Sequence, residues 1–372
     1  MRFPEFGGEW QNVTLSDIVT RVTRKNKNNE SRLPLTISAQ YGLVDQISFF
    51  NKVVASADMS NYYLLKEGEF AYNKSYSSEY PWGAIKRLDR YPQGALSSLY
   101  ICFGINDNVD SDFLVHYFES SKWHKEVSNI AGEGARNHGL LNIAVGDFFN
   151  TAHCIPATIK EQQKIAALLN LITERIATQI KIIEDLKKLK SAIRTKVFKQ
   201  LESSCECWSE IGNMLQYEQP SKYLVASTEY SDSYATPVLT ANKAFILGYT
   251  DEEFGIYSKG ECVIFDDFTM DVKFVNFPFK VKSSAIKILT ANSGKDLYFV
   301  YEYLQNLGLV SEEHKRHYIS EIEPMIVACP TFEEQQNISN LLRSFDSKIE
   351  CANRELTLYN KQKQYLLSQM FI

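Results

Sequence analysis

Hydrophobic residues recur at helical spacing along two long stretches of the chain, 155–201 and 329–372. Between Ile165 and Val197 they return on average just under every 3.6 residues. Between Ile338 and Met370 they alternate steps of three and four, with Lys363 as the polar interruption. Neither stretch has an internal Gly or Pro once its pattern begins. The pattern predicts two amphipathic helices, each about 60 Å long at 1.5 Å per residue, with seams suited to coiled-coil pairing.

The two stretches are copies of each other. Residues 158–198 align without a gap with residues 331–371, and 11 of the 41 positions are identical. Unrelated chains of ordinary composition would share roughly 6%. In each copy a proline ends the preceding segment, and a threonine then stands three residues before a glutamate, which is the spacing of a helix capping box. The identical residues of the first copy are Thr158, Glu161, Gln162, Gln163, Ile165, Leu168, Leu169, Ile176, Lys188, Lys190 and Phe198.

Two interpretations of these helices are open: independent surface helices that share a cap, or helices that pair with each other. The matched lengths and seams favour pairing. We expect the pair to be antiparallel, because a whole globular segment separates the end of the first helix from the start of the second. The residues expected to hold the pair are Glu161, Gln162, Ile165, Leu169, Ile176 and Ile183 in the first helix, and Glu334, Gln335, Ile338, Leu342, Ile349 and Leu356 in the second.

The segments that precede the helices, 1–154 and 202–328, share an order of local patterns. Trp10 and Trp208 each precede a short apolar turn, and Gly68-Glu69 and Gly260-Glu261 each lead into a strand-like run. An aromatic, helix-like stretch follows in both segments, at 113–118 and 298–304. We therefore predict an α+β fold in which two domains, 1–154 and 202–328, are each followed by a long helix, 155–201 and 329–372. The whole is a tandem, pseudo-two-fold repeat in which antiparallel coiled-coil helices separate the domains.

Charge and cysteine content narrow the function only slightly. The net charge is −5. Residues 1–154 carry 15 basic and 17 acidic side chains, residues 155–201 carry 10 basic and 4 acidic, residues 202–328 carry 10 basic and 19 acidic, and residues 329–372 carry 5 of each. None of these segments is therefore a strongly basic clamp for DNA. The seven cysteines have no Cys-x-x-Cys spacing, so reduced structural thiols are favoured over metal ligands at Cys205-Glu206-Cys207 or His153-Cys154. No apolar run reaches the ~20 residues of a membrane span, and no signal peptide is evident. We expect a cytoplasmic protein without a metal site.

At this point the sequence resembles a known family, the specificity subunits of type I restriction-modification systems. The Pro-x(0–1)-Thr-x-x-Glu-Gln-Gln-x-Ile-x-x-Leu-Leu stretches at 156–169 and 330–342 carry the resemblance, together with the opening Phe6-Gly7-Gly8-Glu9-Trp10 and the two Gly-Glu turns. The resemblance covers essentially the whole chain. One departure is Thr173, where many members have Asp, although Asp346 fits in the second copy. The other departure is the acidic second domain.

The resemblance implies that each domain is a target recognition domain that reads one half of a bipartite, asymmetric DNA sequence. It also implies two methyltransferase subunits docked on the helices, and restriction-translocase subunits as possible further partners. S-adenosylmethionine, ATP and Mg²⁺ would then be bound by those partners. This chain would carry no cofactor and no catalytic residue.

The candidate DNA contacts are side chains whose hydrogen-bonding groups match base edges or phosphates. Any one of them could equally be solvated surface. The basic run Lys187-Lys188-Leu189-Lys190, continued by Arg194, Lys196 and Lys199, could be a solvated helix face or could face the DNA spacer or docked subunits. The candidates are Arg21, Arg24, Lys25, Lys27, Lys74, Ser75, Tyr76, Ser77, Arg136, Asn137 and His138 in the first domain, and Lys222, Tyr223, Asn242, Lys243, Lys273, Lys315, Arg316 and His317 in the second.

Other functions find less support. A methyltransferase would need an [Asn/Asp]-Pro-Pro-[Tyr/Phe] motif, and Asn276-Phe277-Pro278-Phe279 lacks the first proline; the Gly132-Glu133-Gly134 turn lacks a third glycine and a βαβ context. A metal-dependent nuclease could be imagined from Asp266, Asp267, Asp271 and Lys273, but these residues lie on one acidic loop. The non-enzymatic alternative is a coiled-coil scaffold that binds only proteins.

Overall fold

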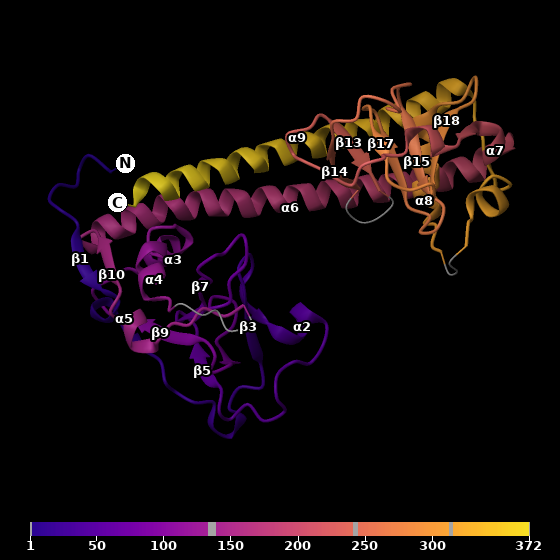
Figure 1. Cartoon of the computed structure of the whole chain (residues 1–372). Helices are drawn as coiled ribbons and strands as arrows, with labels where there is room; N and C mark the ends of the chain where they lie inside the picture. Colours follow the sequence, from indigo (N-terminus) through magenta and orange to yellow (C-terminus); the bar gives the residue numbers. More distant parts are fainter. Residues whose placement is uncertain (1, 133–138, 241–244, 312–314, 372) are drawn as a thin grey trace. The chain divides into compact units, whose positions relative to one another are not determined.

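A computed structural model describes residues 2–132, 139–240, 245–311 and 315–371 (Figure 1). The chain packs into two compact units. Unit 1 is Met1–Ile180 with Glu355–Ile372, and unit 2 is Lys181–Arg354. The two long helices, α6 (Ile159–Ser204) and α9 (Phe332–Met370), therefore each contribute a segment to both units.

Unit 1 contains a four-stranded sheet in the order β2-β9-β6-β7 and a second in the order β4-β3-β8-β5. A separate antiparallel pair, β1 and β10, leads into α6. In the second sheet β3 and β8 run parallel. The strands are β1 (Gln11–Thr14), β2 (Val19–Arg21), β3 (Pro34–Ser38), β4 (Gly42–Asp45), β5 (Tyr63–Lys66), β6 (Phe70–Asn73), β7 (Ala84–Arg87), β8 (Gln93–Leu96), β9 (Ile101–Ile105) and β10 (Ala152–Ile155). The short helices are α1 (Leu15–Ile18), η1 (Lys27–Asn29), α2 (Gln46–Phe50), α3 (Ser111–Glu119), α4 (His124–Ile130) and α5 (Val145–Phe149).

Unit 2 repeats this plan. Its sheets have the orders β12-β18-β15-β16 and β14-β13-β17, and the pair β11 and β19 leads into α9. Here β13 and β17 are the parallel neighbours. The strands are β11 (Trp208–Glu210), β12 (Leu215–Glu218), β13 (Thr236–Leu239), β14 (Ile246–Thr250), β15 (Cys262–Asp266), β16 (Val272–Val275), β17 (Lys280–Val281), β18 (Ile286–Ala291) and β19 (Ile326–Ala328). The helices are α7 (Ile211–Met214), η2 (Pro220–Tyr223), α8 (Leu297–Leu307) and the π-helix η3 (Tyr318–Ile322).

The two units confirm the predicted α+β tandem repeat, with α6 lying between two sheet-rich parts in the sequence. The Gly-Glu turns are confirmed as strand entries: Gly68 has φ +83° before β6, and Gly260 has φ +96° before β15. Glycine adopts this left-handed region without a Cβ clash. Each tryptophan precedes a short helix, as predicted: Trp10 lies five residues before α1, and Trp208 lies three residues before α7.

Each unit has a core built from its own sheets and from both long helices. In unit 1, Phe70 and Phe103 of the sheet pack with Ile165 and Leu169 of α6 and with Met370 of α9. In unit 2, Phe198 of α6 and Leu342 of α9 belong to the same cluster as Val263 and Leu289 of the sheet. Smaller clusters under the second sheets complete the two cores. The apolar seams therefore pack against the sheet-rich parts as well as against each other.

The helix segments in unit 1 run antiparallel, as predicted. The Arg175 guanidinium lies 5.7 Å from the Tyr359 ring centroid, and Gln179 Nε2 donates to Glu355 Oε2 at 3.1 Å. The partner number falls as the first number rises, which defines the antiparallel register. In unit 2, Lys190 of α6 and Asp346 of α9 form an ion pair of 2.6 Å. Of the predicted seam residues, Ile183 is buried, and Ile176, Ile338, Ile349 and Leu356 are partly buried.

Four predicted helix-pairing residues have other roles. Gln162 and Gln335 are 1% exposed and join each long helix to its own domain: Gln162 Oε1 accepts from the Asp110 N–H, and Gln335 Oε1 accepts from the Asp296 N–H. Glu334 forms the predicted capping box with Thr331. Glu161 does not close its box, because its carboxylate accepts hydrogen bonds from Arg2 and Trp10 instead.

No helix among the described residues is long and apolar enough to cross a membrane.

Candidate nucleic-acid interface

A cleft of about 350 Å³ runs beside the edge strand β2 in unit 1, and two predicted phosphate contacts line it. Arg21 is exposed on the strand. Arg24 follows it, and its guanidinium is held by the Glu69 carboxylate at 2.7 Å. Glu69 also accepts a hydrogen bond from the Lys66 N–H. The exposed Arg21 can therefore bind an anion directly. Arg24 can bind one only after its ion pair with Glu69 breaks, and a surface ion pair is weak enough to break.

Two further predicted basic residues lie on the loop after β2. Lys25 donates to the Asn61 carbonyl at 2.9 Å, and its ammonium lies 4.1 Å from the centroid of the Tyr63 ring. Lys27 is exposed at the start of η1. Directly after the two arginines that line the cleft, the chain therefore carries one lysine held by the fold, Lys25, and one solvated lysine, Lys27.

The predicted stretch 74–77 forms a short loop after β6 that is held by the segment 139–141. The Leu141 N–H donates to the Lys74 carbonyl at 2.9 Å, and the Tyr76 N–H donates to the Gly139 carbonyl at 3.0 Å. Ser75, Tyr76 and Ser77 are exposed. Arg136, Asn137 and His138, which directly precede this segment, lie outside the described residues.

Unit 2 presents four of its predicted cations at the surface. Lys222 on η2, Lys273 on β16 and Arg316 are exposed. Lys315 is exposed as well and is paired with Glu321 at 3.0 Å. Asn242 and Lys243 lie outside the described residues.

Two predicted contacts of unit 2 are buried and must be corrected. Tyr223 is 7% exposed, and its hydroxyl donates to Glu218 at 2.7 Å. His317 is 2% exposed, with its ring nitrogens beside Ser311 and Glu321 at 2.9 Å each. A side chain whose polar atoms are already satisfied inside the fold cannot reach a base edge without unfolding its surroundings. Both residues support the fold in this structure.

The carboxylates Asp266 and Asp267, which a metal-dependent nuclease could have used, make hydrogen bonds and an ion pair that hold the fold. The Asp266 carboxylate accepts from the backbone N–H groups of Phe268 and Thr269. Asp267 is 1% exposed; it pairs with Lys287 at 3.2 Å and accepts from the backbone of His317. Among the described residues no group of three or more His, Cys, Asp or Glu is placed to hold a metal ion. All seven cysteines are free thiols.

The structure also shows residues that hold the sheets on the long helices. In unit 1, Asn170 of α6 bonds to His116 and Asp112 of α3, and Asp112 pairs with Arg87 of the edge strand β7 at 2.7 Å. In unit 2, Arg343 of α9 pairs with Glu261 at 3.0 Å, and its guanidinium lies 4.2 Å from the Tyr298 ring centroid. Asn170 and Arg343 occupy equivalent positions of the repeat, but their side chains differ. The alignment of the two repeat copies therefore could not predict this role.

No protein-family model matches the chain. Over 176 residues the chain is 41% identical to the type I restriction enzyme EcoR124I/EcoR124II specificity subunit of Escherichia coli. This stretch of the chain is therefore similar to part of a type I specificity subunit. The match spans 44% of this chain and 44% of that specificity subunit, so the aligned part is less than half of either protein.

Solved structures extend the likeness in fold to the whole chain. The type I S subunit from M. genitalium is 16% identical, with a TM-score of 0.60 over 100% of this chain and 99% of that one. A chain from a type I restriction-modification assembly is 14% identical, with a TM-score of 0.59 over 98% of both chains. At these identities the comparison shows that the chain shares the S-subunit fold.

Proposed function

We propose that this chain recognises a bipartite, asymmetric DNA sequence, with one half-site read by each sheet-rich part, and directs partner methyltransferase and restriction subunits to it. The observation that carries the proposal is the 41% identity to a type I specificity subunit. The duplicated plan supports it, because two sheets of the same strand order carry different side chains and can therefore read different half-sites.

In this proposal the chain performs no catalysis. Its side chains bind and orient DNA, while methyl transfer and strand cleavage belong to the partners, which would bring S-adenosylmethionine, ATP and Mg²⁺. The exposed contacts proposed for unit 1 are Arg21, Lys27, Ser75, Tyr76 and Ser77, and those for unit 2 are Lys222, Lys273 and Arg316. The net charge of −5 is compatible with this, since partner subunits can supply much of the phosphate contact.

The test is to produce the chain with its methyltransferase in a host that lacks other adenine and cytosine methylation, and to sequence the methylome. We expect methylation at one bipartite motif with a fixed spacer. Arg21→Ala should weaken binding of the complex to the duplex and make the negative slope of log K against log salt shallower by about 1. Lys52→Ala, an exposed lysine outside the candidate set, is the control.

The same complex also tests the alternative that the chain is a coiled-coil scaffold that binds only proteins. If the complex shifts no duplex pool in electrophoresis and no motif appears in the methylome, the chain binds proteins only and the proposal fails. Methylation at a single contiguous motif would also contradict it, because two separate readers require a gap between half-sites.

A further inference from the structure

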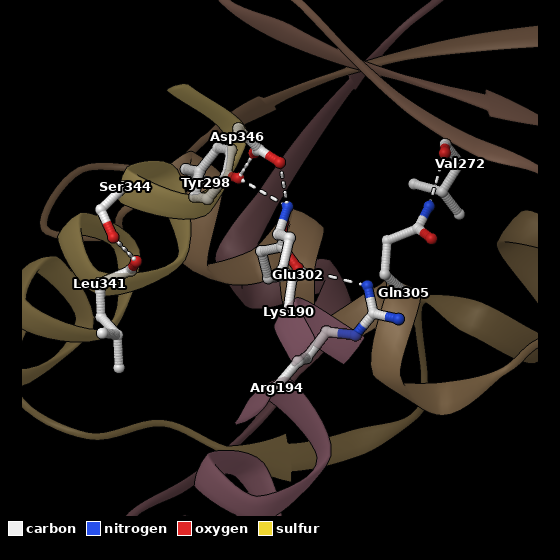
Figure 2. Close-up of polar contacts among 9 residues, drawn as sticks. All are labelled: Lys190, Arg194, Val272, Tyr298, Glu302, Gln305, Leu341, Ser344 and Asp346. Atoms are coloured by element: carbon white, nitrogen blue, oxygen red, sulfur yellow. Dashed lines mark hydrogen bonds and ion pairs between the residues drawn. The ribbon is translucent and has the colours of Figure 1, made fainter. Parts of the chain in front are cut away.

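Lys190 of α6 lies at the centre of a polar cluster inside unit 2 (Figure 2). Its ammonium pairs with the Glu302 carboxylate on α8 and with the Asp346 carboxylate on α9, both at 2.6 Å. Its side chain is 12% exposed and that of Glu302 is 0% exposed. Tyr298 of α8 completes the cluster by donating its hydroxyl to Asp346. Lys190 thus joins α6 and α9 to α8, which packs on the sheet β12-β18-β15-β16, called here the recognition sheet of unit 2.

The connection continues to the edge of that sheet. Gln305, on the same helix α8 as Glu302, donates from Nε2 to the Val272 carbonyl of β16 at 2.6 Å (Figure 2). The next residue on β16 is Lys273, which is exposed and is one of the proposed DNA contacts. Polar contacts at the two sides of α8 therefore connect Lys190 of α6 with Val272 of β16, the residue before the proposed DNA contact Lys273.

The repeat supplies an independent second instance. Lys363 of α9 is the counterpart of Lys190, and in unit 1 it pairs with Glu119 of α3 at 2.9 Å. Its side chain is 13% exposed, close to the 12% of Lys190. The two acidic partners stand at different positions of α3 and α8, so the lysine is the shared part of the contact.

Stability alone does not account for these charges. A buried ion pair recovers little net free energy, because desolvation offsets most of the attraction, whereas its strict geometry can fix a register. Arg194, whose guanidinium lies 3.4 Å from Glu302, corresponds in the repeat to Leu367, which is 2% exposed in the apolar core of unit 1. In unit 1 an apolar side chain therefore fills this position beside the Lys363–Glu119 pair, so the charge of Arg194 is not what the two units share.

We propose that Lys190 is a positioning residue whose pairs with Glu302 and Asp346 fix the orientation of the unit 2 recognition sheet on the long helices, and that this orientation sets which spacer length between half-sites is accepted. The second clause rests on the proposed function; the first does not. Lys363 has the corresponding role in unit 1.

The test uses the double variant Lys190→Met with Glu302→Gln, which removes both charges of the Lys190–Glu302 pair together. Asp346 and Arg194 lose these partners, but their side chains, 46% and 19% exposed, can still reach solvent. Lys181→Met, an exposed lysine of α6 in unit 2 that lies outside the basic run 187–199, is the matched control. In the complex with its methyltransferase, we measure Kd for duplexes with the native spacer, with one base pair more or less, and with one half-site scrambled. We expect discrimination between spacers to fall by about tenfold, equivalent to about 1.4 kcal/mol, while discrimination against the scrambled half-site is kept.

A second measurement is independent of DNA. Spin labels at positions 187 on α6 and 273 on β16, both in unit 2, report the orientation directly in a background with Cys207→Ser and Cys351→Ser. The distance distribution should be narrow in the parent and broad in the double variant. An unchanged distribution overturns the positioning role, and a broadened one with unchanged spacer discrimination overturns the link to spacing. If the parent complex binds no bipartite duplex, the proposed function fails, and the spin-label result still decides the role of Lys190.

Discussion

At the scale of single residues, the clearest feature is a glutamine that occupies the same buried position in both repeats. Gln162 and Gln335 each bond to the backbone N–H of the aspartate that caps α3 or α8, and each donates to the carbonyl of the proline before its long helix. The sequence predicted that these residues matter, because they are identical between copies. It could not predict their partners, since Asp110 and Asp296 are distant in the chain and belong to the parts that diverged.

Replacing either glutamine by alanine should destabilise its own unit by a similar amount. The change leaves a buried N–H and a buried carbonyl without partners, which costs about 1–3 kcal/mol. Hydrogen exchange measured by mass spectrometry on α3 and α8 would show the loss in unit 1 for Gln162→Ala and in unit 2 for Gln335→Ala. The neighbouring Gln163 and Gln336 are exposed and give matched controls. Equal effects from Gln162→Ala and Gln163→Ala would contradict the assigned contact.

His153 on β10 should make unit 1 less stable in mild acid. Burial lowers the pKa of His153 from 6.5 to about 4, and its ring lies between the Tyr117 and Thr151 hydroxyls. Because the folded pKa is depressed, the stabilisation is complete above pH ~6.5 and is lost as pH falls towards the folded pKa, on the order of 3 kcal/mol in total. Urea unfolding between pH 7 and pH 4 would show this.

Tryptophan fluorescence in a Trp208→Phe background reports on unit 1, since Trp10, Trp82 and Trp123 all lie there. His153→Gln removes the titrating group, so its stability should vary less with pH than that of the parent protein. Parallel curves for the two proteins would exclude His153 as the source of the acid sensitivity.

At the scale of elements, the long helices were predictable and the sheets were only partly so. Helical periodicity, capping threonines and the internal repeat define α6 and α9 from the sequence alone. Strand entries at Gly68 and Gly260 could also be predicted from the glycine turns. The parallel neighbours β3 with β8 and β13 with β17 could not, because such pairing joins segments far apart in the chain and leaves no periodic signal. Burial of Tyr223 and His317 was missed for the same reason.

An aromatic residue near the C-terminal end of each long helix, Phe198 within α6 and Phe371 directly after α9, anchors that helix to a sheet-rich part. Phe198 packs on Phe299 and Tyr303 with ring centroids 5.5 and 4.6 Å away, and Phe371 packs on Phe113 and Tyr117 at 5.5 and 5.6 Å. Phe198→Ala should destabilise unit 2 by about 3–5 kcal/mol, and Phe371→Ala should do the same in unit 1.

Hydrogen exchange of the strands in each unit would measure this effect. Leu189→Ala and Leu358→Ala, at side chains 49% and 62% exposed, are the controls and should change little. Faster exchange in unit 1 after Phe198→Ala, with unit 2 unaffected, would show that the anchor has been assigned to the wrong unit.

At the scale of the whole molecule, the repeat in the sequence was the most informative signal, and net charge the least. The four-way division into domain and helix segments follows the linear order, whereas packing combines pieces from both repeats in each unit. A linear pattern shows which segments are helical, but it does not show which core each half of a helix completes. That information lies in long-range contacts such as Phe371 with Phe113.

This division of the helices has a consequence for how the protein is made. Leu367, Met370 and Phe371 belong to the core of unit 1, yet the ribosome adds them after all of residues 181–354. The N-terminal part therefore cannot complete its core while it emerges, and it must wait, with apolar surface exposed, until α9 has been synthesised. Nascent chains arrested before residue 367 should bind chaperones that recognise such surface, and release of the finished chain should end that association.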